Sequence, residues 1–103
     1  MNLRELLEAR ATELANVTAT RTADGAMTWA YGDRAFAVLS PDGAAAEFAL
    51  DAPIAAAAGR TPDVEPSARG VGWVLFRARA LDDHAVDRAR AWFDSAHRRL
   101  TRG

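Results

Sequence analysis

Arginine is the residue type in this 103-residue chain whose spacing points most directly to a chemistry. Residues 60–103 carry nine arginines against six acidic residues, whereas residues 1–59 carry four arginines against eight acidic residues. At the roughly 100° per residue of an α-helix, a helix that starts near residue 82 gathers a polar stripe beside Trp92. The members of this basic stripe are His84, Arg88, Ser95, Arg98, Arg99 and Arg102.

Two interpretations of the basic stripe differ in what it contacts. A row of arginines beside an aromatic ring would follow a phosphate backbone, which makes five residues candidate nucleic-acid or partner contacts: Arg88, Arg98, Arg99, Arg102 and Trp92. The alternative is a solvated face whose last arginines complement the helix dipole. The net charge of −1 and the isoelectric point near 6.1 favour the solvated face, because DNA-binding domains are usually strongly basic.

A second group of charged residues lies in the segment 60–69. Four of them are spread around two prolines and match neither the helical nor the strand period: Arg60, Asp63, Glu65 and Arg69. We interpret the segment as an exposed loop, and loops of this kind often carry binding residues. It would present a small-ligand or partner contact; a solvated connection is the alternative that we favour.

No pattern of metal or cofactor binding is found. His84 and His97 are the two histidines, and their separation on one helix turns them about 220° apart, so they cannot share a metal ion. The absence of cysteine removes thiolate ligands and disulfides. No glycine-rich loop leads from a strand into a helix. We therefore expect neither a metal nor a cofactor.

Catalytic patterns are also missing. Ser40, Ser67 and Ser95 lie outside any nucleophile-elbow sequence. The neighbouring Asp82 and Asp83 would diverge at a helix start, where capping explains them fully. We predict no catalytic residue.

The elements that position the basic stripe are a strand over 71–77 and a helix over 82–100. Alternation leaves bulky side chains on both faces of this strand, which predicts an interior position in a sheet. The helix begins with Asp82 as N-cap and Asp83 in its first turn. Its apolar side chains fall in one arc that would pack on the sheet: Val86, Ala89, Phe93, Ala96 and Leu100.

The first half of the chain predicts a helix followed by a meander. Asn2 and Glu5 form a capping-box-like start for a helix over 3–15. From residue 17 the period changes to two, and the turn residues at 24–25, 32–33 and 41–43 separate strands over 17–22, 26–31, 34–40 and 44–50. We expect the core-facing side chains to be Met27, Trp29 and Tyr31, then Phe36 and Val38, then Ala46, Phe48 and Leu50. Pro53 and Gly59 then bound a short helix to about residue 58.

These elements predict one α+β domain over residues 1–103. We expect an antiparallel sheet of about five strands, with an N-terminal helix, a short helix and a C-terminal helix packed on the sheet. The N-terminus contains acidic residues and no long apolar stretch, so we expect neither a signal peptide nor a membrane span. Arginine as the sole cationic residue type and 25 alanines are typical of GC-rich bacterial coding sequences.

Several short motifs resemble the MmcQ/YjbR family of small bacterial domains. Residues 34–39, the Pro-Asp-Gly turn and residues 46–50 are similar to its hairpin, and Gly72-Trp73-Val74 with the closing helix is similar to its ending. The same ending resembles a family of small domains labelled luciferase-like. The resemblance implies a secretion-chaperone-like α+β fold and a double-wing DNA-binding role without a catalytic residue set. Asp51 stands where the family has a lysine, which weakens the DNA-binding expectation.

The leading hypothesis for function is a non-catalytic cytoplasmic interaction module that makes protein–protein contacts, with a homodimer as one form. The absence of cysteine suits a reducing compartment. The second hypothesis is a DNA-binding accessory protein that uses the basic stripe. The third is an enzyme or ligand-binding domain with a site that the sequence does not reveal.

Overall fold

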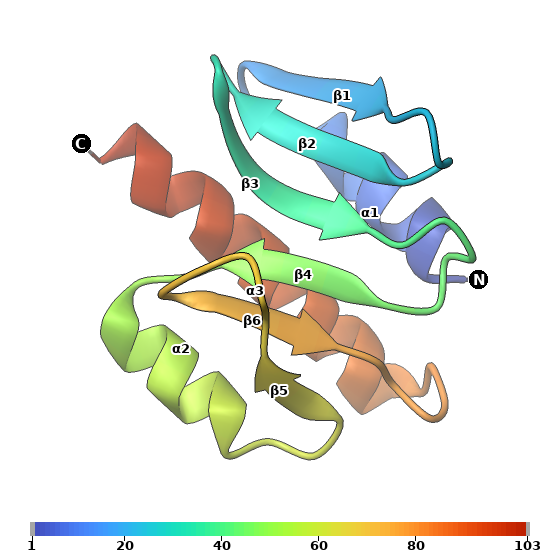
Figure 1. Ribbon diagram of the computed structural model, residues 1–103, viewed down its shortest axis with the longest axis vertical. Helices are drawn as coiled ribbons and strands as arrows, with labels where there is room; N and C mark the ends of the chain where they lie inside the picture. The colour runs from blue at the N-terminus through green and yellow to red at the C-terminus, as the bar shows by residue number, and fades with distance from the viewer. Residues whose placement is uncertain (1, 103) are drawn as a thin grey trace.

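The computed structural model describes residues 2–102, which form three helices and one six-stranded antiparallel sheet (Figure 1). The elements follow in the order α1 (Leu3–Ala11), β1 (Val17–Arg21), β2 (Met27–Tyr31), β3 (Arg34–Leu39), β4 (Ala46–Ala49), α2 (Ala52–Gly59), β5 (Val64–Pro66), β6 (Trp73–Phe76) and α3 (Asp83–Thr101). The strand order is β1-β2-β3-β4-β6-β5. The predicted α+β class and the interior position of β6 are confirmed, and the sheet has one strand more than predicted.

Helix α1 begins where the capping pattern places it. The Asn2 Oδ1 accepts a hydrogen bond of 2.8 Å from the Glu5 backbone N–H, and the Asn2 side-chain amide donates back to the Glu5 carboxylate at 3.3 Å. The helix ends at Ala11, so the predicted end at residue 15 is wrong. The chain turns at Asn16, whose φ of 61° is left-handed and redirects the backbone into β1.

The four-stranded meander is held by tight turns with glycine at positive φ. Gly25, Gly32 and Gly43 have φ values of 94°, 63° and 74°. Asp24 and Asp42 each accept a hydrogen bond from the backbone N–H two residues on, which closes the turns after β1 and β3. The predicted strands are confirmed with slightly shorter bounds.

The segment 60–69 is not a plain loop, which corrects the prediction made for it. Residues 64–66 form β5, which pairs with β6 and makes the outer edge of the sheet. Three residues that end in a proline give too short an alternation to be recognised as a strand. Helix α2 packs beside β5 and β6, and its Ala58 belongs to the core.

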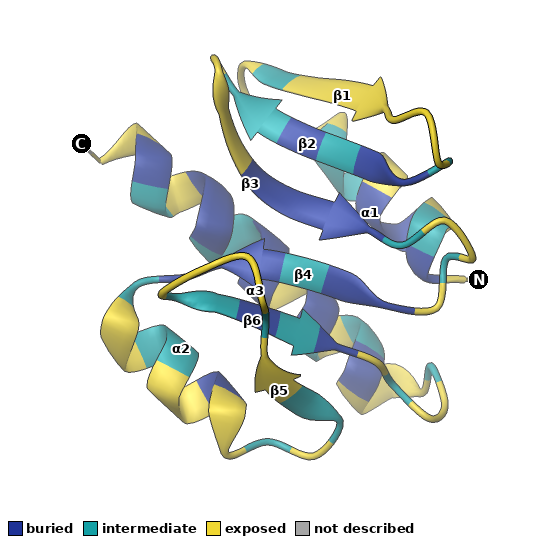
Figure 2. Cartoon of the chain, viewed as in Figure 1, coloured by how far each residue is buried: buried dark blue, intermediate teal, exposed yellow. Residues whose placement is uncertain are grey.

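Helix α3 lies across one face of the sheet together with α1 (Figure 1). The Asp82 Oδ1 caps α3 by accepting from the Ala85 N–H at 2.9 Å, as predicted. Its buried side chains face β2, β3 and β4 (Figure 2), and Phe93 contacts both Trp29 and Phe36 edge to face. None of the helices within residues 2–102 is both long and apolar enough to span a membrane.

A β-bulge in β3 changes which side chains face the helices. Ala30 pairs with Ala35 and Trp29 with Ala37, so Phe36 is the extra residue. Phe36 packs toward α3, but Val38 pairs with Thr28 and lies on the opposite face, and Leu39 takes the core position beside Met27. The prediction that Phe36 and Val38 share a face is therefore wrong.

Candidate functional site

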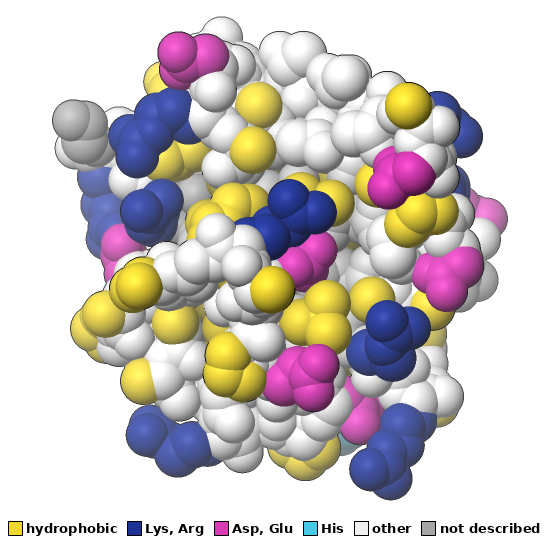
Figure 3. Space-filling view, viewed as in Figure 1, with side chains coloured by type: hydrophobic (Ala, Val, Ile, Leu, Met, Phe, Trp, Pro, Cys, Tyr) yellow, Lys and Arg dark blue, Asp and Glu magenta, His cyan; other side chains and the backbone are white. Residues whose placement is uncertain are grey.

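The face of the sheet opposite α1 and α3 carries no helix over β1 to β4 (Figure 1). Cross-strand partners share a face, so the register places one row of side chains on it from β1 to β5: Thr20, Thr28, Val38, Glu47, Leu75 and Glu65. Thr18, Ala30 and Ala35 form a second row on β1 to β3. Figure 3 shows that atoms over β1 to β3 are mostly uncharged, with charged side chains at the margins. We call this surface the open face.

Strand β1 leaves a row of backbone groups without a partner strand. The Thr22 N–H donates to the Ala26 carbonyl at 2.8 Å, so these two residues form a hydrogen-bonded pair across the turn. Because such pairs alternate along an antiparallel ladder, Thr20 and Thr18 bond to β2 while Val17, Ala19 and Arg21 direct their N–H and C=O groups outward. No described element lies beyond β1 in Figure 1.

The β1 edge is unusually free of the devices that normally protect an edge strand. Its sequence is Val-Thr-Ala-Thr-Arg, with one charge at its end and no proline. All four residues after Val17 are exposed. The strand therefore offers three outward N–H donors and three outward C=O acceptors that can extend a sheet.

The opposite edge, β5, is protected. The Ser67 N–H donates to the Trp73 carbonyl and the Arg77 N–H donates to the Asp63 carbonyl, so the alternation turns Val64 and Pro66 outward. Pro66 has no N–H, which leaves Val64 as the one outward donor of β5. The two edges of the sheet thus differ sharply in their capacity to pair with another strand.

A strap formed by residues 67–72 crosses the open face at β4 and β6 (Figure 1). The Glu47 carboxylate, whose side chain is 20 % exposed, accepts from the Arg69 Nε at 2.9 Å and from the Ser67 hydroxyl. The Arg69 guanidinium also lies over the Trp73 ring, 5.8 Å from its centroid. The Leu50 N–H donates to the Gly72 carbonyl at 2.9 Å. These contacts hold the strap on the sheet.

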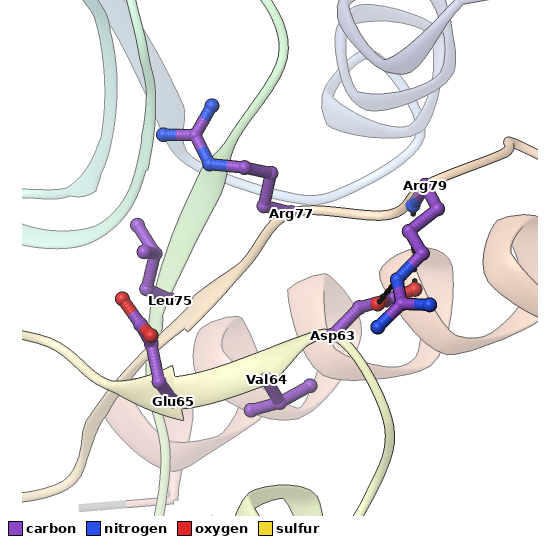
Figure 4. A pocket seen from close by; sticks show the side chains of 6 residues that line it. All are labelled: Asp63, Val64, Glu65, Leu75, Arg77 and Arg79. Atoms are coloured by element: carbon purple, nitrogen blue, oxygen red, sulfur yellow. Dashed lines mark hydrogen bonds and ion pairs between the residues drawn. The ribbon is translucent and has the colours of Figure 1, made fainter.

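A shallow hollow of about 410 Å³ lies at the β5 and β6 end of the open face, as Figure 4 shows. Asp63 and Arg79 form an ion pair at 3.2 Å on its rim, and Asp63 has a left-handed φ of 68°. Glu65 and Leu75 stand side by side, and Arg77 points away from the ion pair (Figure 4). Two acidic residues, Asp63 and Glu65, and two arginines, Arg77 and Arg79, line the hollow, so it presents no converging set of one charge.

The four predicted loop residues do not form one site. Arg69 is bound to Glu47, Asp63 is bound to Arg79, and Glu65 lies on β5. Arg60 caps the end of α2 with its backbone N–H and is exposed. Sequence alone missed the partners Glu47 and Arg79, because neither lies in the segment 60–69.

The basic stripe is divided by acidic residues. Asp51, directly before α2, forms ion pairs with Arg99 at 3.6 Å and with Arg102. These contacts tie the end of α3 to the start of α2 and neutralise two of the four predicted arginines. Arg88 and Arg98 form no ion pair among the described residues.

Asp94 adds a further acidic group one turn before Arg98. Its carboxylate accepts from the Arg10 Nε at 2.7 Å, which joins α3 to α1. The hydrogen bond and charge of Asp94, with a smaller contribution from Glu13, raise the pKa of Arg10. This face of α3 is thus a mixture of both signs of charge.

Trp92 does not lie at the margin of the basic stripe, which corrects its predicted placement. The residue is 9 % exposed and packs in the core, with its ring centroid 5.2 Å from that of Phe76 and 6.3 Å from that of Phe48. Its large apolar surface explains this position, because burial of an aromatic ring is more favourable than its exposure beside arginines.

The histidines and serines have structural partners. His84 is exposed at the start of α3, whereas His97 is buried, lies 2.9 Å from the Ala15 carbonyl through Nε2, and packs against Tyr31 and Phe36. Among residues 2–102 no cluster of potential metal ligands is present. The hydroxyls of Ser40, Ser67 and Ser95 bond to Asp42, Glu47 and Arg98, and not to a histidine.

Comparisons with protein-family models, with curated proteins and with solved structures found no match for this chain.

Proposed function

We propose that this protein is a non-catalytic interaction module that binds another polypeptide strand along the β1 edge. The observation that carries the proposal is the outward row of backbone donors and acceptors at Val17, Ala19 and Arg21, on a strand with one charge and no proline. Strand addition at such an edge obtains its affinity from main-chain hydrogen bonds. The adjoining threonines and alanines of the open face would contact alternate side chains of the added strand.

The protection of β5 supports this assignment. A chain that closes one edge with Pro66 and leaves the other open can add a strand at one end of its sheet only, which prevents growth into fibres. The proposed role agrees with the leading hypothesis from sequence.

The proposed function is tested with a proline at the centre of the edge. Because the Ala19 N–H points outward, Ala19→Pro removes an edge donor and leaves the β1–β2 ladder intact. Ala19→Val is the matched control, since it retains the N–H. A library of random twelve-residue peptides displayed on phage is selected against each immobilised protein, and the molar mass of each protein is measured by light scattering.

We expect the wild type and Ala19→Val to retain β-branched, extended peptides or to associate with themselves, and Ala19→Pro to do neither. A monomeric wild type that selects no peptides would overturn the proposal. Peptides that bind Ala19→Pro as tightly as the wild type would also overturn it, because their binding would not use the edge.

A further inference from the structure

The outward-facing residues of β1 are spaced symmetrically about Ala19. Val17 and Arg21 lie two positions on either side of Ala19, and all three face away from β2. A second β1 strand that runs antiparallel, with a two-fold axis at Ala19, would place Ala19 opposite Ala19 and Val17 opposite Arg21. In this register every outward N–H of one copy meets an outward C=O of the other.

We infer that the occupant of the β1 edge is a second copy of this chain in this register, an inference that rests on the proposed function. Two copies would form one continuous sheet across the two-fold axis, with α1 and α3 of both copies on the same face. The β5 edges, which are protected by Pro66, would then be the outer edges of the dimer. The assembly would be closed, with no open edge left for a third copy.

The side chains across the axis are compatible with self-pairing. Thr18 of one copy faces Thr20 of the other on the open face, a cross-strand pair that stabilises sheets. Ala19 is small and exposed, so two copies of it meet without a clash. Arg21 lies opposite the apolar Val17, and the two copies of Arg21 stand at opposite ends of the paired strands. Like charges therefore never face each other directly.

Any extended peptide presents backbone groups at this spacing, so the side chains decide which strand is preferred. A second copy places threonine opposite threonine and keeps the two Arg21 side chains apart. The chain's net charge of −1 adds little repulsion between copies.

The absence of cysteine from the chain permits a direct test of the register. A hydrogen-bonded antiparallel pair has Cα atoms about 5.5 Å apart, within the roughly 4.4–6.8 Å that a disulfide spans. Ala19→Cys should therefore cross-link to itself under mild oxidation. Thr18→Cys and Thr20→Cys should cross-link to each other when mixed, and poorly alone, because Thr18 lies diagonally about 7–8 Å from its own copy.

Ala35→Cys is the control, because Ala35 is exposed on the open face and lies on β3, away from the edge. We expect Ala19→Cys to form the disulfide dimer at least about tenfold faster than Ala35→Cys, since pairing raises the effective concentration of the thiol. Light scattering should give the cysteine-free wild type twice the mass of one 11.1 kDa chain, and Ala19→Pro the mass of one.

Equal cross-linking rates for Ala19→Cys and Ala35→Cys would overturn the inference. So would rapid self-cross-linking of Thr18→Cys, which would mean a different register. If the wild type is monomeric but selects peptides whose binding is lost in Ala19→Pro, the inference of a second copy is wrong and the proposed function is supported. If the wild type is monomeric and selects no such peptides, both the inference and the proposed function are wrong.

Discussion

The indole ring of Trp29 and the phenyl ring of Phe93 meet edge to face, with centroids 5.4 Å apart and planes at 85°. Trp29 lies on β2 and Phe93 on α3, so their contact joins the sheet to the helix that covers it. Phe93 also meets Phe36 at 5.2 Å and is fully buried. Three aromatic side chains thus form the centre of the core.

We expect Phe93→Ala to lower the free energy of unfolding by about 3–5 kcal/mol, because it opens a cavity between the rings of Trp29 and Phe36. Urea unfolding should show a lower midpoint with an unchanged slope. Ala91→Ser, at an exposed position on the same helix, should change stability by no more than about 0.5 kcal/mol. A wild-type midpoint for Phe93→Ala would contradict the packing described here.

Gly72 should be intolerant of a side chain. A Cβ there would lie 2.7 Å from the Leu50 carbonyl oxygen, and φ is +84°. Gly43 has a similar φ of +74° but open space around it, so Gly43→Ala measures the backbone strain alone, about 1–2 kcal/mol. Gly72→Ala should lose clearly more stability than Gly43→Ala in thermal unfolding. Equal losses would mean that the strap moves away from Leu50 at little cost.

The aspartates of the turns after β1 and β3 should make the stability of the fold depend on pH in the acid range. A hydrogen bond from the Thr22 hydroxyl and one from the Ala26 N–H lower the pKa of Asp24 from its ordinary 3.8, and Ser40 and the Ala44 N–H do the same for Asp42. A lowered folded-state pKa stabilises the fold above the unfolded-state value, and that contribution is lost as the pH falls below about 4.

The measurement is urea unfolding from pH 7 to pH 2 for the wild type and for the double variant Asp24→Asn/Asp42→Asn. The wild type should be the more stable protein at neutral pH, and the difference should shrink below about pH 4. A difference that stays constant over this range would show that the carboxylates do not titrate with folding.

The basic stripe should not bind DNA. Asp51 pairs with Arg99 and Arg102, which leaves two of the four arginines of the basic stripe, Arg88 and Arg98, without an ion pair among the described residues. Fluorescence anisotropy of a labelled duplex of about twenty base pairs should show no binding at micromolar protein, even at low salt where electrostatic attraction is strongest. The same titration is carried out with Asp51→Asn, a variant in which the guanidinium groups of Arg99 and Arg102 lose their ion pairs.

Binding by the wild type that weakens steeply with salt, and that Arg88→Glu/Arg99→Glu abolishes, would restore the DNA-binding hypothesis. It would also show that the Asp51 ion pairs open readily in solution, as half-exposed pairs of small net stability can do.

The sequence predicted best those elements whose signals are local. Turn residues and the period of two located β1 to β4, and Asp82 located the start of α3. Features that depend on a partner far along the chain were missed. The bulge at Phe36 arises from pairing with β2, and β5 exists as a strand because β6 lies beside it. Neither the bulge nor the pairing of β5 can be recognised from the alternation of apolar and polar residues within one strand.

The candidate site was less accessible to sequence analysis than the fold. Three arginines of the basic stripe lie on α3 and Arg102 is its C-cap, but Asp51, the partner of Arg99 and Arg102, lies about fifty positions away. The β1 edge carries no conspicuous side chain, since its donors and acceptors are backbone groups. The available signal was a negative one: the first strand of the meander lacks the charges and prolines that usually protect an edge.

The position of α3 at the end of the described chain has a consequence for synthesis. The core face of β1 to β4, with Trp29, Phe36 and Phe48, is complete by residue 49, whereas the helix that covers it ends at Thr101. At about 5–20 residues per second, a ribosome needs on the order of three to ten seconds to make the intervening segment. A sheet that formed during that interval would expose aromatic rings and an unpaired edge together, the two surfaces that make folding intermediates prone to aggregate.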